Sequence, residues 1–304
     1  MQVFHIEADK LKYIDESPFR SEKELQKIID SNLKRIFNLD LIKAQFPVGD
    51  LRIDTVAYDS NNKSFVLIEY KNNVNFSVID QGYTYLNLLI ANKAEFILLY
   101  REITGKELKK EDIDWSATRV LFISPEFTKY QVRAISVDLP IELIEIHRFF
   151  NDSIVLNRIE TNKNVAVSAT SSSFNSQIVK KVAREIKLYS EDYHLNKTSE
   201  KLKGIYQYLK DRIMGLGENI VVKPHKNYIS FIASTNFVDI HVAKGKLKLW
   251  LNLKKGELND PQHISRDVST IGHWGNGEYN IDVKDEHNLE YLMNLIEQSY
   301  KKNS

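Results

Sequence analysis

The sequence predicts a mixed α/β sheet flanked by helices, followed by a smaller α+β domain. Apolar segments alternate with helical ones over residues 1–160, polar residues fill 161–176, and short alternating segments between helical stretches occupy 177–304. A length of 304 residues also favours two domains, each large enough to bury its own core. We therefore expect domains at 1–160 and 177–304, joined by a linker at 161–176.

The composition is that of a soluble globular protein, with 42% hydrophobic and 27% charged residues. The absence of cysteine excludes disulfides and thiolate chemistry, and it fits a cytoplasmic location. No apolar run approaches the roughly 18 residues of a membrane span, and residues 1–5 do not begin a signal peptide, so we expect no membrane partner. A net charge of +1 predicts no strong non-specific binding of nucleic acid, although it allows a local basic face.

The first elements are an expected strand pair or arm within residues 1–20 and a helix from Ser21 to about residue 37. Ser21 and Glu24 form a capping-box pattern at the helix start. The helical phase turns Glu22 toward the apolar face and Glu24 toward water, so Glu22 is the candidate site residue. The alternative is that Glu22 only favours the helix N-terminus electrostatically.

A β-hairpin over residues 50–58 and 65–71 carries the central charged cluster. Both halves are rich in β-branched and aromatic residues, and turn formers separate them. Strand alternation puts Glu69 and Lys71 on one face, and the hairpin places Asp54 across from Ile68 or Glu69. Charges on such apolar strands are costly to bury without a partner, and a divalent metal ion is the obvious one.

A second capping pattern, Ser77 with Asp80, predicts a helix on which Gln81 and Tyr85 share a face. The alternative makes Tyr85 part of the core and Gln81 its solvent-side neighbour. The segments at 95–100, 118–124 and 141–146 are predicted as further strands. A helix at 126–135 and an edge strand at 153–159 complete the domain.

The order of these elements resembles the PD-(D/E)XK nuclease superfamily over residues 15–150. The residues that carry the resemblance are Glu22, Asp54, Glu69, Lys71, Gln81 and Tyr85. The Gln-x-x-x-Tyr element is similar to the RecB-like branch, and Ser-Glu-x-x-Leu-Gln at 21–26 is similar to the NucS-like group. Ile53 stands where a proline is often found. The resemblance implies a restriction-endonuclease-like fold and a metal-dependent nuclease, active in DNA repair or in defence against foreign DNA.

The resemblance also implies roles for individual residues. Asp54, Glu69 and the Tyr70 carbonyl would bind Mg²⁺ or Mn²⁺, with Glu22 as a direct or water-mediated ligand. Lys71 would orient or deprotonate the attacking water, since a nearby cation pushes a lysine toward its neutral form.

Gln81 and Tyr85 would fix the scissile phosphate or the lysine. The expected partner is nucleic acid, with DNA favoured, and a homodimer stays open. Two alternatives remain: a surface salt-bridge set on a hairpin, and a non-catalytic nucleic-acid-binding or assembly protein that retains a nuclease fold.

The second domain begins with helical periodicity over 178–186 and 202–213, closed by Gly215 and Gly217. Strands are predicted at 220–223, 228–234, 237–243 and 246–253, and a closing helix at 288–300. Blocks at 190–195, 236–238, 266–269 and 272–277 resemble a domain of unknown function. Its relatives are appended to nuclease-like domains and have been labelled predicted transport proteins.

Three lysines of this domain are candidate nucleic-acid ligands. Alternation places Lys244, Lys246 and Lys248 on one strand face, where they could meet phosphates. The alternative is an ordinary solvated face. The histidines show no ligand spacing, so no zinc site is expected.

Overall fold

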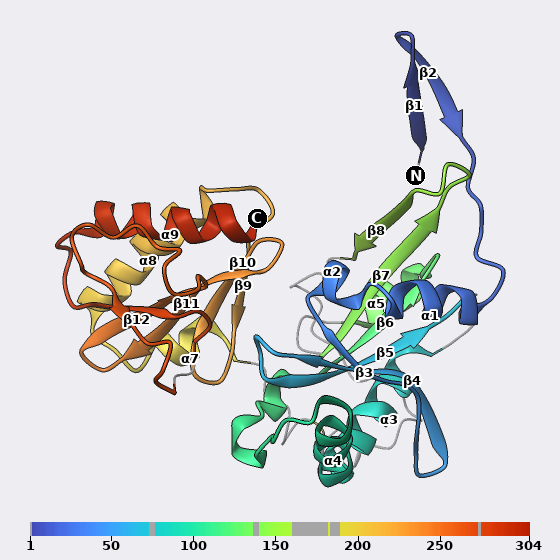
Figure 1. Cartoon of the computed structure of the whole chain (residues 1–304), viewed down its shortest axis with the longest axis horizontal. Helices are drawn as coiled ribbons and strands as arrows, with labels where there is room; N and C mark the ends of the chain where they lie inside the picture. The colour runs from blue at the N-terminus through green and yellow to red at the C-terminus, as the bar shows by residue number, and fades with distance from the viewer. Residues whose placement is uncertain (1, 73–76, 136–139, 160–181, 183–188, 273–274) are drawn as a thin grey trace. The chain divides into compact units, whose positions relative to one another are not determined.

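The computed structural model describes residues 2–72, 77–135, 140–159, 182, 189–272 and 275–304 (Figure 1). The chain forms two compact units, Met1–Lys187 and Leu188–Ser304. The expected linker at 161–176 lies outside the described residues. Within the described ranges, no helix combines the length and the apolar character needed to cross a bilayer.

A six-stranded mixed sheet forms the centre of the first unit, in the order β3-β4-β5-β6-β7-β8. The strands are β3 (Asp40–Val48), β4 (Leu51–Asp59), β5 (Ser64–Tyr70), β6 (Arg119–Ser124), β7 (Ile141–Arg148) and β8 (Ile154–Arg158). β5, β6 and β7 run parallel, whereas the other neighbours pair antiparallel. The predicted mixed sheet, its central hairpin and its edge strand are confirmed.

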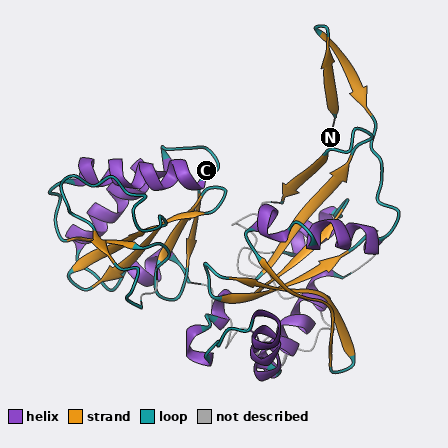
Figure 2. Cartoon of the chain, viewed as in Figure 1, coloured by secondary structure: helices purple, strands orange, loops and turns teal. Residues whose placement is uncertain are grey.

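Helices cover both faces of this sheet (Figure 2). On one face, Leu25 and Ile29 of α1 (Glu22–Asp30) belong to the same apolar core as Ile68 of β5, and α2 (Leu33–Phe37) adds to it. On the other face, Leu86 and Leu89 of α3 (Val78–Ala91) belong to a second core, together with side chains of α4 (Lys93–Thr104). Shorter helices are η1 (Lys110–Asp112), η2 (Trp115–Ala117) and α5 (Lys129–Ala134). The sheet is therefore buried on both sides, which explains its long apolar strands.

Two predicted elements differ from the structure. The helix expected over 21–37 is broken into α1 and α2 at Ser31 and Asn32, whose side chains donate hydrogen bonds to the carbonyls of Lys27 and Ile28. Such side chains compete with the helical backbone bonds. The apolar segment 95–100, expected to be a strand, lies inside α4. That helix ends at Gly105, which has the left-handed φ of 67° typical of a C-cap.

The N-terminal residues form the expected strand pair. β1 (Val3–Glu7) and β2 (Lys10–Ile14) pair antiparallel as a separate two-stranded sheet. In Figure 1 this hairpin projects away from the six-stranded sheet of its unit. We call residues 3–14 the arm.

The second unit is a smaller antiparallel sheet with helices, in the strand order β13-β14-β12-β11-β10-β9. Its strands are β9 (Val221–Pro224), β10 (Ile229–Ile232), β11 (Asn236–Ala243), β12 (Lys246–Leu251), β13 (Arg266–Asp267) and β14 (Tyr279–Val283). Apolar side chains of α8 (Glu200–Met214) and α9 (Leu289–Asn303) pack on this sheet, and α7 (Glu191–Leu195) precedes them. The predicted α+β class is confirmed, and β13 and β14 are strands that the sequence did not predict.

Candidate active site

The site begins at the open end of the β4–β5 hairpin. Thr55 pairs with Ile68 in the antiparallel register, and the next position along the two strands brings Asp54 opposite Glu69. These two acids are therefore cross-strand neighbours. The Asp54 side chain is fixed against β5, because its Oδ2 accepts a hydrogen bond from the Tyr70 amide at 3.1 Å. Of the two positions that the hairpin allowed for the partner of Asp54, the register selects Glu69.

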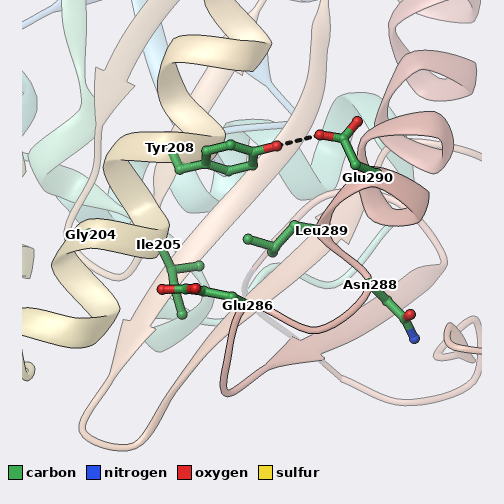
Figure 3. A pocket seen from close by; sticks show the side chains of 7 residues that line it. All are labelled: Gly204, Ile205, Tyr208, Glu286, Asn288, Leu289 and Glu290. Atoms are coloured by element: carbon green, nitrogen blue, oxygen red, sulfur yellow. Dashed lines mark hydrogen bonds between the residues drawn. The ribbon is translucent and has the colours of Figure 1, made fainter.

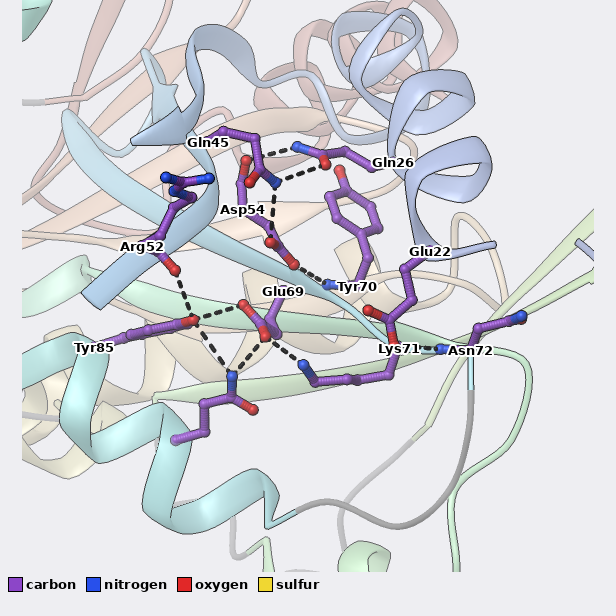
Figure 4. A network of polar contacts seen from close by, with 11 residues as sticks. Glu22, Gln26, Gln45, Arg52, Asp54, Glu69, Tyr70, Lys71, Asn72 and Tyr85 are labelled. Atoms are coloured by element: carbon purple, nitrogen blue, oxygen red, sulfur yellow. Dashed lines mark hydrogen bonds and ion pairs between the residues drawn. The ribbon is translucent and has the colours of Figure 1, made fainter. Parts of the chain in front are cut away.

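Glu69 is buried and holds the centre of a hydrogen-bond network (Figure 4). Its Oε1 accepts from Lys71 Nζ at 2.6 Å and from Gln81 Nε2 at 2.5 Å, and its Oε2 accepts from the Tyr85 hydroxyl at 2.8 Å. Burial, and next the charge of Asp54, raise the pKa of Glu69, while the hydrogen bonds from Lys71 and Tyr85 oppose this rise. Two carboxylates that repel each other are therefore held together by donors.

Lys71 extends from the end of β5 on the same side as Glu69, as strand alternation predicted. Burial acts to lower the pKa of Lys71, but the hydrogen bond and charge of Glu69 outweigh it and raise the pKa overall. The expectation of a neutral lysine concerned a site with a bound cation and stays a prediction, whereas the residues around Lys71 by themselves favour its ammonium form. The physical reason is that the nearest charges, Glu69, Glu22 and Asp54, are all negative.

Gln81 and Tyr85 reach Glu69 from the first turns of α3. The Ser77 side chain caps this helix by accepting from the Asp80 amide, as the sequence predicted. Burial and the neighbouring Glu69 raise the pKa of Tyr85, so its hydroxyl keeps its proton and acts as a donor. Tyr85 is buried, but its polar end and that of Gln81 both face the carboxylate rather than serving only as core and surface residues.

Glu22 lies at the N-terminus of α1, beside the end of β5. Its Oε1 accepts from the Asn72 amide at 3.1 Å, and its charge contributes to the raised pKa of Lys71. Glu24 instead accepts from the Arg20 amide and from Arg148 Nη1 at 2.9 Å. Of Glu22 and Glu24, Glu22 is thus the one that lies toward Lys71 and the end of β5, as the helical phase predicted.

Two glutamines that the sequence did not single out hold Asp54 from its other side (Figure 4). Gln45 Nε2 donates to Asp54 Oδ1 at 3.1 Å and to Gln26 Oε1 at 2.9 Å, and Gln26 Nε2 donates to the Asp54 carbonyl at 2.6 Å. Gln45 has a left-handed φ of 52°, which costs a non-glycine residue conformational energy. Gln26 stands in the quoted Ser-Glu-x-x-Leu-Gln pattern, whereas Gln45 lies on β3, which the sequence did not predict.

A further acid, Asp30, was also missed. It accepts from the Thr55 hydroxyl at 2.8 Å and from the Tyr70 hydroxyl at 2.7 Å. Burial raises the pKa of Asp30 despite these donors, and the Asp54 charge adds to the rise. The available signal was its position four residues after Gln26, on the same face of α1.

The donor set fits a magnesium-like ion with few protein ligands. Among the described residues, no group of three or more acids and histidines is arranged to hold a metal ion, so Glu22 does not complete a three-carboxylate cluster. Mg²⁺ is commonly held by one or two carboxylates, with water and phosphate oxygens filling the octahedron. From the described residues, Glu69 Oε2 and each oxygen of Asp54 accept a single side-chain or amide hydrogen bond, which leaves each a lone pair.

Of the three lysines expected on one strand face of the second unit, Lys246 and Lys248 share a face of β12, whereas the third does not lie on a strand. Lys244 lies in the turn between β11 and β12 rather than on a strand. Lys246 forms an ion pair with Asp282 of β14, and Lys248 is paired in register with the same residue. An acid therefore sits across from both strand lysines and reduces the attraction of this face for phosphate.

The second unit also contains a cavity of about 520 Å³ between α8 and the start of α9 (Figure 3). Glu290 on its wall accepts from the Tyr208 hydroxyl at 2.5 Å and from Arg212 Nη1 at 2.7 Å, so its charge is already compensated. His273 and Trp274, within the block 272–277 that resembles the domain of unknown function, lie outside the described residues.

A buried acid, Asp239, anchors the glycine-rich loop of this unit. Its Oδ1 accepts from Ser230 at 2.6 Å and Asn236 at 2.7 Å, and its Oδ2 accepts from the Asn276 amide at 2.6 Å. Burial raises the pKa of Asp239 to about 6.

Comparisons with known proteins place the chain in a family. An uncharacterised protein of Haemophilus influenzae is 39% identical over 303 residues, which cover 99% of this chain and 100% of the relative. The chain belongs to the family of this protein. Residues 191–303 match the family described as a domain of unknown function, DUF5655, which confirms the resemblance expected for the second domain.

Solved structures with similarity to this chain include a repair endonuclease from Pyrococcus abyssi (19% identity, TM-score 0.24) and an EndoMS–dsDNA complex (16% identity, TM-score 0.22). Each match covers 38% of this chain, and 42% and 40% of the respective partners, so less than half of each endonuclease is spanned. SfsA of Pyrococcus furiosus, solved with Ca²⁺, has 16% identity and a TM-score of 0.24 over 49% of this chain and 75% of that one. At these TM-scores, the function has to be inferred from the site itself.

Proposed function

We propose that the first unit is a metal-dependent nuclease that hydrolyses phosphodiester bonds, with DNA as the favoured substrate and Mg²⁺ or Mn²⁺ as the cofactor. The observation that carries the proposal is the burial of Glu69 beside Asp54, with Lys71, Gln81 and Tyr85 all directed at one carboxylate. A structural salt bridge needs one acid and one base. A second acid that raises the pKa of the first costs stability, so it is expected where a cation binds.

Asp54 and Glu69 would hold the ion, together with the Tyr70 carbonyl at the end of β5. The ion would offset charge on the phosphate and favour ionisation of a bound water. Asp54 is suited to this task because the Tyr70 amide and Gln45 fix both of its oxygens. Glu69 is fixed equally well by the two donors from α3.

Lys71 would act as a donor rather than a base in this proposal. Its ammonium group can hold a non-bridging phosphate oxygen or orient the attacking water, both of which need a positive charge. The hydrogen bond that Lys71 Nζ donates to Glu69 Oε1 at 2.6 Å supports this role as a donor. Glu22, next to the end of β5, is placed to accept a hydrogen bond from a water on the same side.

The test is a cleavage assay with labelled single-stranded, duplex and branched DNA, and with RNA, in Mg²⁺ or Mn²⁺. We expect wild-type protein to cleave at least one DNA substrate and Asp54→Asn to lose at least a hundredfold in rate. Asp50→Asn is the matched control, because Asp50 is an exposed acid at the turn before the same strand. No cleavage of any substrate by protein that binds Mn²⁺ would favour the alternative, a non-catalytic binding or assembly protein.

A further inference from the structure

The arm is an amphipathic β-hairpin with one wholly apolar face. Its register pairs Phe4 with Tyr13 and Ile6 with Leu11, and strand alternation puts all four side chains on the same side. The opposite face carries the charged and polar side chains of the two strands, His5, Glu7, Lys10 and Lys12, together with Val3 and Ile14 at the foot of the arm. The turn residues Ala8 and Asp9 have φ values of 46° and 64°, as a two-residue hairpin turn requires. The arm is therefore a regular hairpin whose two faces differ sharply in chemistry.

Within the described residues, nothing covers the apolar face. The four side chains are between 43% and 70% exposed, and the sheet of the arm contains two strands and no third. Phe4 and Tyr13 contact each other edge to face, with ring centroids 5.5 Å apart. An isolated two-stranded hairpin is marginally stable in water, because it cannot bury its own apolar side chains. The arm is thus shaped to be completed by another surface.

The base of the arm is firmly attached to the domain. The Ser17 amide donates to the Arg148 carbonyl at 2.8 Å, and the Phe150 amide donates to the Asp15 carbonyl at 3.1 Å. Arg148 Nε returns a hydrogen bond to the Ser17 carbonyl at 2.8 Å. These bonds fix the chain just after the arm to the β7–β8 turn, so the arm leaves the domain from a defined point. Two more exposed apolar residues, Phe150 and Ile154, lie at this turn.

We propose that the arm is a docking surface for a second copy of this chain. The apolar face carries no charge, and the cations of the arm lie on its opposite side, so the face suits a protein surface rather than a phosphate backbone. A two-fold contact needs only one patch that is complementary to itself. An antiparallel arrangement of two arms provides this, because the aromatic pair of one arm then lies over the Ile6–Leu11 pair of the other.

The available area is that of a weak but specific dimer. The exposed parts of the four face residues amount to about 400 Å² per copy. This is within the roughly 300–600 Å² of the largest apolar patch on a typical monomer, which is often functional. Two copies would bury about 800 Å² through the arms, below the roughly 1,200–2,000 Å² of stable interfaces and in the range of weak, transient contacts. We therefore expect a concentration-dependent dimer with a dissociation constant in the micromolar range.

Sedimentation of the full chain over a range of concentrations tests the proposal. We expect the double variant Ile6→Lys/Leu11→Lys to weaken dimerisation at least a hundredfold, because it buries two cations at the contact. The matched control His5→Ser/Lys12→Ser changes the opposite face and should leave dimerisation unchanged. Because the arm is separate from both cores, circular dichroism and thermal melting should show that both variants fold like wild type.

The natural absence of cysteine allows an independent measurement. A double Phe4→Cys/Ile6→Cys substitution puts a thiol of one arm over a thiol of the other and should give a disulfide-linked dimer under mild oxidation, whereas His5→Cys/Glu7→Cys on the opposite face should not. The proposal would be overturned if wild-type protein stays monomeric at concentrations about ten times above the expected micromolar dissociation constant. So would a dimer that the double variant leaves intact, or arm variants that change only the affinity for DNA.

Discussion

Removal of Lys71 should distinguish a metal site from a structural salt bridge. In the metal-free chain the Lys71 ammonium lies 2.6 Å from Glu69, and the lysine and glutamate side chains are 19% and 4% exposed. Lys71→Ala leaves Glu69 and Asp54 without this compensating charge. Breaking a buried ion pair costs roughly 3–5 kcal/mol, and the partial exposure of the lysine favours the lower value, about 3 kcal/mol. For a unit of this size, that corresponds to a fall in Tm of about 6–12 °C.

Added Mn²⁺ should then stabilise the variant more than the wild type. In the variant the ion replaces the lost positive charge and does not compete with an ammonium group at Glu69 Oε1. Saturation a hundredfold above the Kd adds about 2.7 kcal/mol to the stability of any binding-competent fold. The tighter site of the variant reaches this level at lower Mn²⁺, so the two Tm values should converge as Mn²⁺ is added. Cleavage by Lys71→Ala should nevertheless stay abolished, because the donor to phosphate or water is missing.

The measurement is a series of thermal melts in EDTA and in increasing Mn²⁺, followed by calorimetric titration. Lys34→Ala is the control, because the pair of Lys34 with Asp40 has a similar distance of 2.8 Å but is 60% and 39% exposed. It should cost less than about 1 kcal/mol and leave the Mn²⁺ response unchanged. If Mn²⁺ raises the Tm of Lys71→Ala no more than that of wild type, the two carboxylates do not share an ion and the reasoning fails.

The remaining predictions concern three other side chains. Gln45→Ala and Gln45→Gly should both weaken Mn²⁺ binding by up to about tenfold in calorimetry, since both release Asp54. The free energy of unfolding of Gln45→Gly should be about 1 kcal/mol higher than that of Gln45→Ala, because glycine adopts the left-handed φ without strain. Equal free energies of unfolding of the alanine and glycine variants would show that the left-handed φ at position 45 is not strained. Tyr85→Phe should lower the free energy of unfolding by about 1.5–3 kcal/mol in denaturant titrations, because Glu69 loses a buried donor. Because folding raises the pKa of Asp239 from 3.8 to about 6, its contribution to stability is present below pH 3.8 and is lost as the pH rises to about 6. This loss, about 3 kcal/mol, should appear as faster hydrogen exchange in β10 and β11, after correction for intrinsic rates, and be absent in Asp239→Asn.

The sequence predicted the parts of the site that depend on local periodicity. Strand alternation placed Glu69 and Lys71 on one side, and helix periodicity placed Gln81 beside Tyr85. Both are properties of a single element with a fixed repeat of two or 3.6 residues. The caps at Ser21 and Ser77 were predictable for the same reason, because a side chain that accepts from the amide three residues later needs no tertiary structure.

The missed parts depend on tertiary contacts. Gln45 reaches Asp54 because β3 pairs with β4, with the pairs Ala44–Thr55 and Phe46–Ile53 on either side of it, and no repeat in the sequence reveals this pairing. The segment 95–100 was assigned to a strand because a short apolar run has the same composition in a buried strand and a buried helix.

Arg148, the last residue of β7, contacts both the foot of the arm and α1. Its guanidinium group donates to the Ser17 and Pro18 carbonyls at the foot of the arm and to Glu24 in the first turn of α1, two residues from Glu22. These bonds connect the foot of the arm to the helix that borders the carboxylate cluster. Thermodynamic reciprocity then sets a strict condition. If association of two copies changes the free energy of ion binding by some amount, ion binding must change the free energy of association by the same amount and in the same direction.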